Sequence, residues 1–122
     1  MPRRITDEVG RAVVSEVLAG GASRDSTATA VRYLLQALAD VAPGNTVEVR
    51  VPPFGAVQAV AGPKHTRGTP PNVVEMDATA WVALATGSLT WDEAVADGRI
   101  SASGQRSQLE KFFPVFTETG AH

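Results

Sequence analysis

The spacing of apolar residues predicts two helices in the first third of the chain. From Val31 to Val41, apolar side chains recur every three or four positions, which is the period of an amphipathic helix, and Asp25 or Ser26 is placed to cap it. A weaker repeat of the same kind runs from Thr6 to Leu18. Because that segment is only partly apolar, we expect it to form a surface helix or a partly mobile arm.

A change to a period of two predicts strands in the middle of the chain. In TVEVRV (residues 46–51) the three valines point to one side and the polar residues to the other, so one side must meet an apolar layer. Further short strands are expected at about residues 56–61, 73–76 and 99–103.

Capping residues predict three short helices in the last third of the chain. Asp77 is placed to cap the first of them. Thr90 and Glu93 form a T-x-x-E capping box for the second, and Ser107 and Glu110 repeat this box for the third. Each helix has only two or three turns, so all three must pack on a common apolar body to be stable.

Together these elements predict an α+β fold. We expect a small, mainly antiparallel sheet of four to five strands that is covered on one face by helices. The expected organisation is a single domain over residues 23–122, preceded by an N-terminal helix or arm over residues 1–22.

Charge and composition exclude several classes of function. The net charge of −2 gives no basis for a nucleic-acid partner. The chain has no cysteine, which excludes disulfides, thiolate metal sites and cysteine nucleophiles and fits a cytoplasmic protein. No stretch approaches the roughly 20 apolar residues that span a membrane, and no signal-peptide pattern follows the basic N-terminus. We therefore expect no stable membrane insertion.

The sequence does not predict an enzyme. Its two histidines are His65 and His122, and no G-x-S-x-G elbow, P-loop or dinucleotide fingerprint occurs. No metal ligand set and no cofactor site are expected from these residues. The carboxylates of Asp92 and Glu93 beside Trp91 could suggest acid–base chemistry, but capping of a short helix is the preferred interpretation.

Aromatic residues are concentrated near the C-terminus. The last third of the chain holds both tryptophans and three of the four phenylalanines. They could fill a closed core, or they could line a cavity that a ligand completes. The tail FFPVFTETGAH (residues 112–122) is a candidate lid for such a cavity.

Residues 77–113 resemble the C-terminal half of sterol carrier protein 2 domains. The matching features are Thr-Gly at residues 86–87, Ala-Val at 94–95, and the G-R-I-x-x-x-G run at 98–104, followed by a last helix that contains Leu109. Val95 stands where the family usually has phenylalanine. With the stretch VPPFGAVQAVAGPKHTRGTPPNVVE, the chain further resembles the short bacterial sterol carrier family proteins over most of residues 25–113.

The resemblance implies a non-enzymatic carrier of a lipid, fatty acid or acyl-CoA. The ligand would occupy an apolar cavity between the sheet and the C-terminal helices. The residues expected to line that cavity are Val47, Val49, Trp81, Leu84, Trp91, Val95, Ile100, Phe112 and Phe113.

A long polar loop at residues 62–72 suggests a site for an anionic head group. Lys64, His65 and Arg67 of this loop, with Arg50 from the neighbouring strand, could bind a carboxylate or phosphate beside the cavity. The alternative is a solvated surface loop in which proline and glycine residues only define the turns.

A second class of function remains open. The domain could have a closed core and act as a protein-interaction or accessory module that partners an enzyme, or it could form a homodimer. Cavity volume distinguishes these possibilities, because small-molecule sites in proteins normally begin near roughly 300 Å³.

Overall fold

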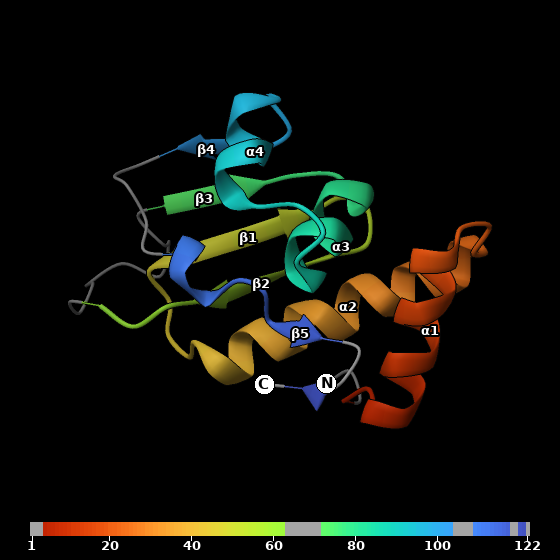
Figure 1. The fold of residues 1–122 in the computed structure, drawn as a ribbon. Helices are drawn as coiled ribbons and strands as arrows, with labels where there is room; N and C mark the ends of the chain where they lie inside the picture. Colours follow the sequence, from red (N-terminus) through yellow and green to blue (C-terminus); the bar gives the residue numbers. More distant parts are fainter. Residues whose placement is uncertain (1–3, 63–71, 104–108, 118–119, 122) are drawn as a thin grey trace.

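The computed structural model describes residues 4–62, 72–103, 109–117 and 120–121, and it shows a four-stranded sheet with helices on one face (Figure 1). The helices are α1 (Asp7–Ala19), α2 (Arg24–Val41), α3 (Ala78–Thr86), α4 (Trp91–Ala96) and the short 3₁₀ helix η1 (Leu109–Phe112). The strands are β1 (Val47–Val51), β2 (Gly55–Ala59), β3 (Asn72–Glu75), β4 (Ser101–Ser103), β5 (Phe116–Thr117) and β6 (Gly120–Ala121).

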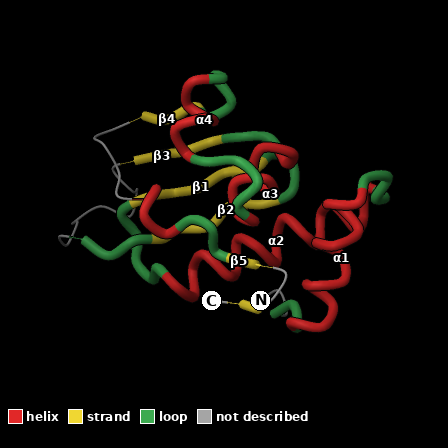
Figure 2. The backbone as a smooth tube through the Cα atoms, in the orientation of Figure 1, coloured by secondary structure: helices red, strands yellow, loops and turns green. Residues whose placement is uncertain are grey.

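The sheet has the strand order β2-β1-β3-β4 (Figure 2). β1 pairs antiparallel with β2, and β3 pairs antiparallel with β4, while the central pair β1–β3 is parallel. The predicted α+β fold with a small, mainly antiparallel sheet is therefore confirmed. The short strands β5 and β6 form a separate two-stranded pair.

The alternation predicted for β1 places its valines in the core. Val47, Val49 and Val51 are fully buried, whereas Arg50 is exposed on the opposite face of the sheet. Figure 1 shows α2 and α3 on the side of the sheet that the valines face. Fully burying one such valine contributes roughly 1.5–3 kcal/mol, so this face supplies much of the stability of the two layers.

The predicted helix starts are confirmed for three of the four helices whose predicted capping residues the structure describes. Thr6, Asp77 and Thr90 each accept a hydrogen bond from the backbone N–H three residues on. For α2, both predicted caps were wrong. Ser23 has the extended backbone of a cap and its Oγ accepts from the N–H of Ser26 at 3.0 Å, so Ser26 lies within the first turn.

The weakly apolar first helix is packed on α2. Gly10 lies directly against the ring of Tyr33, and Val14 is fully buried. The N–H and C=O of Ile5 are both bonded, at 2.9 Å, to the side-chain amide of Gln36. Gly10 allows this close approach because it has no side chain, and for the same reason it adds nothing to the apolar pattern of the helix.

The interpretation of the C-terminal tail as an exposed lid is wrong for its described middle part. Phe116 is only 2% exposed and its ring meets Tyr33 edge to face at 5.9 Å. The N–H of Val115 donates to the carbonyl of Ala85 at 3.0 Å. Pro114 interrupts the helical pattern, but the chain continues into the core. The predicted last helix is reduced to the single turn η1, and its predicted cap, Ser107, lies outside the described residues.

Candidate functional site

Four of the residues predicted to line a cavity lie in the packed core. Val47, Val49, Trp81 and Leu84 are at most 1% exposed. The indole N–H of Trp81 donates to the carbonyl of Val31 at 3.2 Å, which ties α3 to α2. These side chains are in direct contact with the core, and only Leu84 among them also borders a described cavity.

The aromatic residues near the C-terminus meet at one groove. Phe113 contacts Trp81 edge to face, with ring centroids 5.7 Å apart, and stacks on Trp91 at 6.2 Å with 14° between the ring planes. A cavity of about 290 Å³ opens beside this stack, and we call it the aromatic groove. It is lined by Leu84, Gly87, Leu89, Thr90, Trp91, Asp92, Glu110, Phe113 and Pro114.

The capping box of α4 fixes the position of Trp91. The Thr90 hydroxyl accepts from the N–H of Glu93 at 3.1 Å, and the Glu93 carboxylate accepts from the N–H of Thr90 at 2.8 Å. The backbone hydrogen bond from Thr90, and then its side-chain hydrogen bond, lower the pKa of Glu93. Glu93 therefore caps the helix, as its spacing predicts, and Trp91 begins the helix at the wall of the groove.

The remaining apolar candidates do not border the aromatic groove. Ile100 and Phe112 are half-buried at the margin of the core, and the ammonium of Lys111 lies 5.4 Å from the centre of the Phe112 ring. Val95 is 53% exposed, because the buried Ala94 takes the inward position of α4. A one-residue offset on a helix turns a side chain by roughly 100°, which moves Val95 away from the core.

Of the predicted head-group residues, Arg50 is not brought to the aromatic groove. Arg50 lies on the open face of the sheet, where its guanidinium contacts the carboxylate of Glu48 at 3.1 Å. That hydrogen bond raises the pKa of Arg50. Because side chains alternate along a strand, Arg50 and Val49 necessarily face opposite sides. His65 and Arg67 lie outside the described residues.

A second, larger cavity lies between α2 and the edge of the sheet. Its volume is about 430 Å³, and we call it the α2–β2 groove. It is lined by Arg4, Ile5, Arg32, Leu35, Gln36, Phe54, Gly55, Ala56 and Val57. This groove was not predicted from the sequence. Its one available signal was Phe54, an aromatic residue in a turn between two strands.

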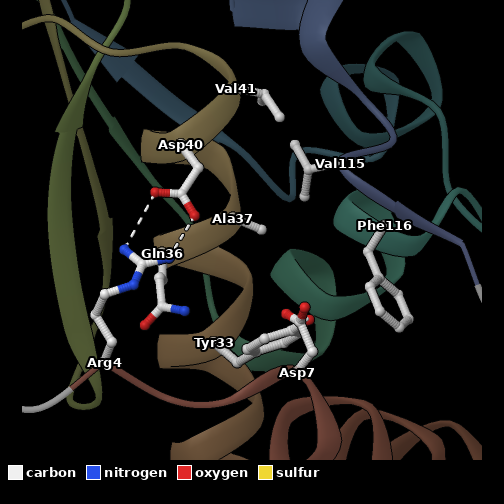
Figure 3. A pocket seen from close by; sticks show the side chains of 9 residues that line it. All are labelled: Arg4, Asp7, Tyr33, Gln36, Ala37, Asp40, Val41, Val115 and Phe116. Atoms are coloured by element: carbon white, nitrogen blue, oxygen red, sulfur yellow. Dashed lines mark hydrogen bonds and ion pairs between the residues drawn. The ribbon is translucent and has the colours of Figure 1, made fainter. Parts of the chain in front are cut away.

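A third, smaller pocket lies on the other side of the N-terminal segment (Figure 3). Arg4 forms an ion pair with Asp40 at 2.7 Å, and the Tyr33 hydroxyl donates to Asp7 at 2.8 Å. Gln36 lines both this pocket and the α2–β2 groove, so the segment that it holds separates the two. The volume here is only about 180 Å³, and its polar groups already bond to one another.

The contact between Tyr33 and Asp7 should make stability fall at high pH. Burial, and then the hydrogen bond to Asp7, raise the pKa of Tyr33 to about 12 from its ordinary value of 10.0. A raised folded-state pKa means that the stabilisation is complete below pH ~10 and is lost as the pH rises toward ~12. Because Tyr33 is the chain's one tyrosine, absorbance at 295 nm follows it directly. Tyr33→Phe should flatten the stability profile over this range. A midpoint near pH 10 in the folded protein would contradict the assignment.

The part of the chain that the structure describes has neither a metal-binding cluster nor a membrane-spanning helix. No group of three or more histidine, cysteine, aspartate or glutamate residues there could hold a metal ion. None of the described helices combines the length and the apolar character needed to cross a membrane.

Comparison with known proteins identifies the family. No curated protein matches the chain. Residues 23–115 match the sequence profile of the family described as bacterial SCP ortholog, and this range begins at the cap of α2 and ends beside β5. The match covers more than half of the chain and includes the sheet, α3, α4 and the aromatic groove. The chain therefore belongs to the bacterial SCP ortholog family, a branch of the sterol carrier proteins.

Proposed function

We propose that the protein binds a hydrophobic ligand in the aromatic groove and carries it without chemical reaction. The observation that supports this proposal most directly is the stacked pair of Trp91 and Phe113 beside an apolar cavity of about 290 Å³. Membership of a sterol carrier family agrees with a binding role. Small-molecule sites typically have apolar walls with few polar groups, and Leu84, Leu89 and Pro114 supply such walls here.

The rim of the aromatic groove favours an uncharged ligand. The acidic residues Asp92 and Glu110 are among those that border the cavity. An anionic head group beside Asp92 would be disfavoured, because like charges repel each other even near water. An uncharged lipid such as a fatty alcohol is therefore a better fit to this groove than a free fatty acid, which is one of the ligand classes that the family resemblance implies.

Native mass spectrometry of gently purified protein tests the proposal first. A discrete mass excess that extracts into organic solvent would establish a carried ligand and its chemical class. The purified protein should then be titrated with a long-chain fatty alcohol and with the fatty acid of equal length, with tryptophan fluorescence as the readout. We expect the alcohol to bind more tightly.

Trp91→Ala should weaken binding of the fatty alcohol by roughly tenfold or more, since removing an aromatic wall forfeits on the order of 1.5–3 kcal/mol of apolar contact. Val95→Ala is the matched control, because Val95 belongs to the same helix but is exposed. Affinities of these two variants should be measured by calorimetry, which does not depend on tryptophan emission. Equal effects of the two substitutions would place the ligand elsewhere.

A protein-interaction module is the second candidate function. It is favoured by the close packing of Val47, Val49 and Trp81, which leaves these predicted lining residues inside the core. The volume of the aromatic groove also lies at the lower limit for small-molecule sites, which is roughly 300 Å³. A bare mass in native spectrometry, together with no response to either lipid, would support this second function.

A further inference from the structure

The outer edge of β2 carries backbone groups that its only neighbour in the described sheet does not bond. The N–H of Met76 donates to the carbonyl of Arg50 at 3.1 Å, so the peptide groups of Arg50 face β3. Successive residues of a strand direct these groups to alternate sides. The backbone N–H and C=O groups of Val49 and Val51 therefore point toward β2, where these residues pair with Val57 and Gly55.

The same alternation then applies to β2. Because the backbone groups of Gly55 and Val57 point toward β1, the N–H and C=O groups of Ala56 and Gln58 point away from the sheet. The carbonyl of Phe54 lies on the same outer side, where it accepts a hydrogen bond of 2.7 Å from Nε of Arg32. The sequence of β2, GAVQA, has no charged residue and no proline, which are the usual devices that protect an edge strand from pairing.

This edge borders the α2–β2 groove, which is apolar at its floor and basic at its rim. Ile5, Leu35 and Val57 line the cavity of about 430 Å³. Arg32 lies at the end of the groove where β2 begins, and the guanidinium of Arg24 lies 5.2 Å from the centre of the Phe54 ring. A guanidinium has five N–H donors, and the bond to Phe54 uses one of those on Arg32.

We propose that the α2–β2 groove binds an extended peptide segment of a partner protein, which adds to β2 as a new edge strand. The backbone of the peptide would pair with Ala56 and Gln58, and alternate side chains would enter the groove, as in other cases of strand addition. A carboxylate at the C-terminal end of the peptide would bind Arg32. Because Arg32 marks the start of β2, the added strand runs antiparallel to β2.

The charge of the rim argues for a partner of different sequence over a second copy of this chain. In a two-fold dimer each partner presents the same surface, and antiparallel pairing of two β2 edges would place Arg32 of one copy opposite Ala59 at the end of the other β2 strand. Ala59, Val60 and Ala61 supply no carboxylate to Arg32 there, whereas a peptide that ends in a carboxylate complements it. A lipid would fill the groove but would offer no row of backbone donors and acceptors to the outward peptide groups of Ala56 and Gln58.

A selection from random heptapeptides with free C-termini, made on the full-length protein, tests this proposal. We expect enrichment of peptides that have apolar residues at alternate positions. Their binding should shift the backbone amide signals of residues 55–59 in NMR spectra. No enrichment, or shifts confined to other residues, would overturn the proposal. Displacement of enriched peptides is not expected from a long-chain fatty alcohol bound in the aromatic groove, so this test stands apart from the test of the carrier function.

Substitution and backbone methylation then separate strand addition from simple apolar docking. Amidation of the peptide C-terminus and Arg32→Gln should each weaken binding roughly tenfold or more, which is the usual effect of losing a charge-assisted hydrogen bond. When the two changes are combined, their effects on the binding free energy should not add, because both remove the same contact. Arg50→Gln, on the open face, is the matched control and should have no effect. Two peptides N-methylated at alternate positions should differ, because only one set of peptide N–H groups faces β2. If both methylated peptides bind equally well, the peptide does not form backbone hydrogen bonds with β2 and the proposal fails.

Discussion

Replacement of Trp81 with alanine should lower the free energy of unfolding by about 3–5 kcal/mol, the usual cost of removing a large aromatic side chain from a core. Trp81 is 0% exposed and is the largest of the fully buried side chains. Its ring packs against Phe113, and its indole N–H bonds to the carbonyl of Val31. The loss would therefore affect the contact between α3 and α2 and the support that Trp81 gives to Phe113, which lines the aromatic groove. Urea unfolding followed by circular dichroism measures it.

Two further variants show whether the core position of Trp81 is the cause. Trp81→Phe keeps an aromatic ring and loses the hydrogen bond, so its cost should be well below that of Trp81→Ala. Trp91→Ala removes a half-buried ring and should also cost less. If Trp91→Ala proved the more destabilising of the two alanine variants, the assignment of Trp81 to the core and Trp91 to the groove wall would be wrong.

Gly10→Ala should destabilise the protein by about 1–3 kcal/mol, which is typical of overpacking a tight contact. A Cβ atom at this position would overlap the ring carbons of Tyr33, and that ring is itself held between Asp7 and Phe116. Alanine normally has a higher helix propensity than glycine, so a loss of stability here would be opposite to the change that helix propensity alone predicts. Thermal and urea unfolding of the variant measure the effect.

Ala12→Val is the control for Gly10→Ala, because Ala12 is exposed on the same helix and has room for added methyl groups. We expect it to change stability by less than ~0.5 kcal/mol. The comparison also tests the proposed division of the chain at residue 22. If α1 were an independent arm, Gly10→Ala would release it without changing the main unfolding transition.

Local signals predicted most of the elements of the fold. The alternation of β1 and the caps of α1, α3 and α4 depend on neighbours within four positions, so they can be read from the sequence. The parallel pairing of β1 with β3 could not be predicted in this way, because it depends on tertiary contacts between segments that are far apart in the sequence. The burial of Phe116 was missed for the same reason: its contacts are with Tyr33 and Arg11, far away in the sequence.

The candidate site was predicted only in part. Trp91, Phe113 and Leu84 do meet at one groove, since each lies on a helix end that a cap or a break defines. Val95 and Arg50 were grouped with them on chemical character, but helical rotation and strand alternation turn both away. The α2–β2 groove combines residues from three separate segments, and no spacing rule connects Ile5, Leu35 and Val57.

The parallel pair at the centre of the sheet has a consequence for how the chain folds. The β1–β2 hairpin needs only the short turn between Val51 and Gly55, so it can form early. β3 can reach its place beside β1 only after the whole segment 52–71 has closed into a loop, and the entropic cost of that closure precedes any gain from pairing. Non-local pairings of this kind slow folding. The sheet is therefore expected to form first on its β2 side. The β1–β2 hairpin beside α2 would then be in place before β3 pairs with β1.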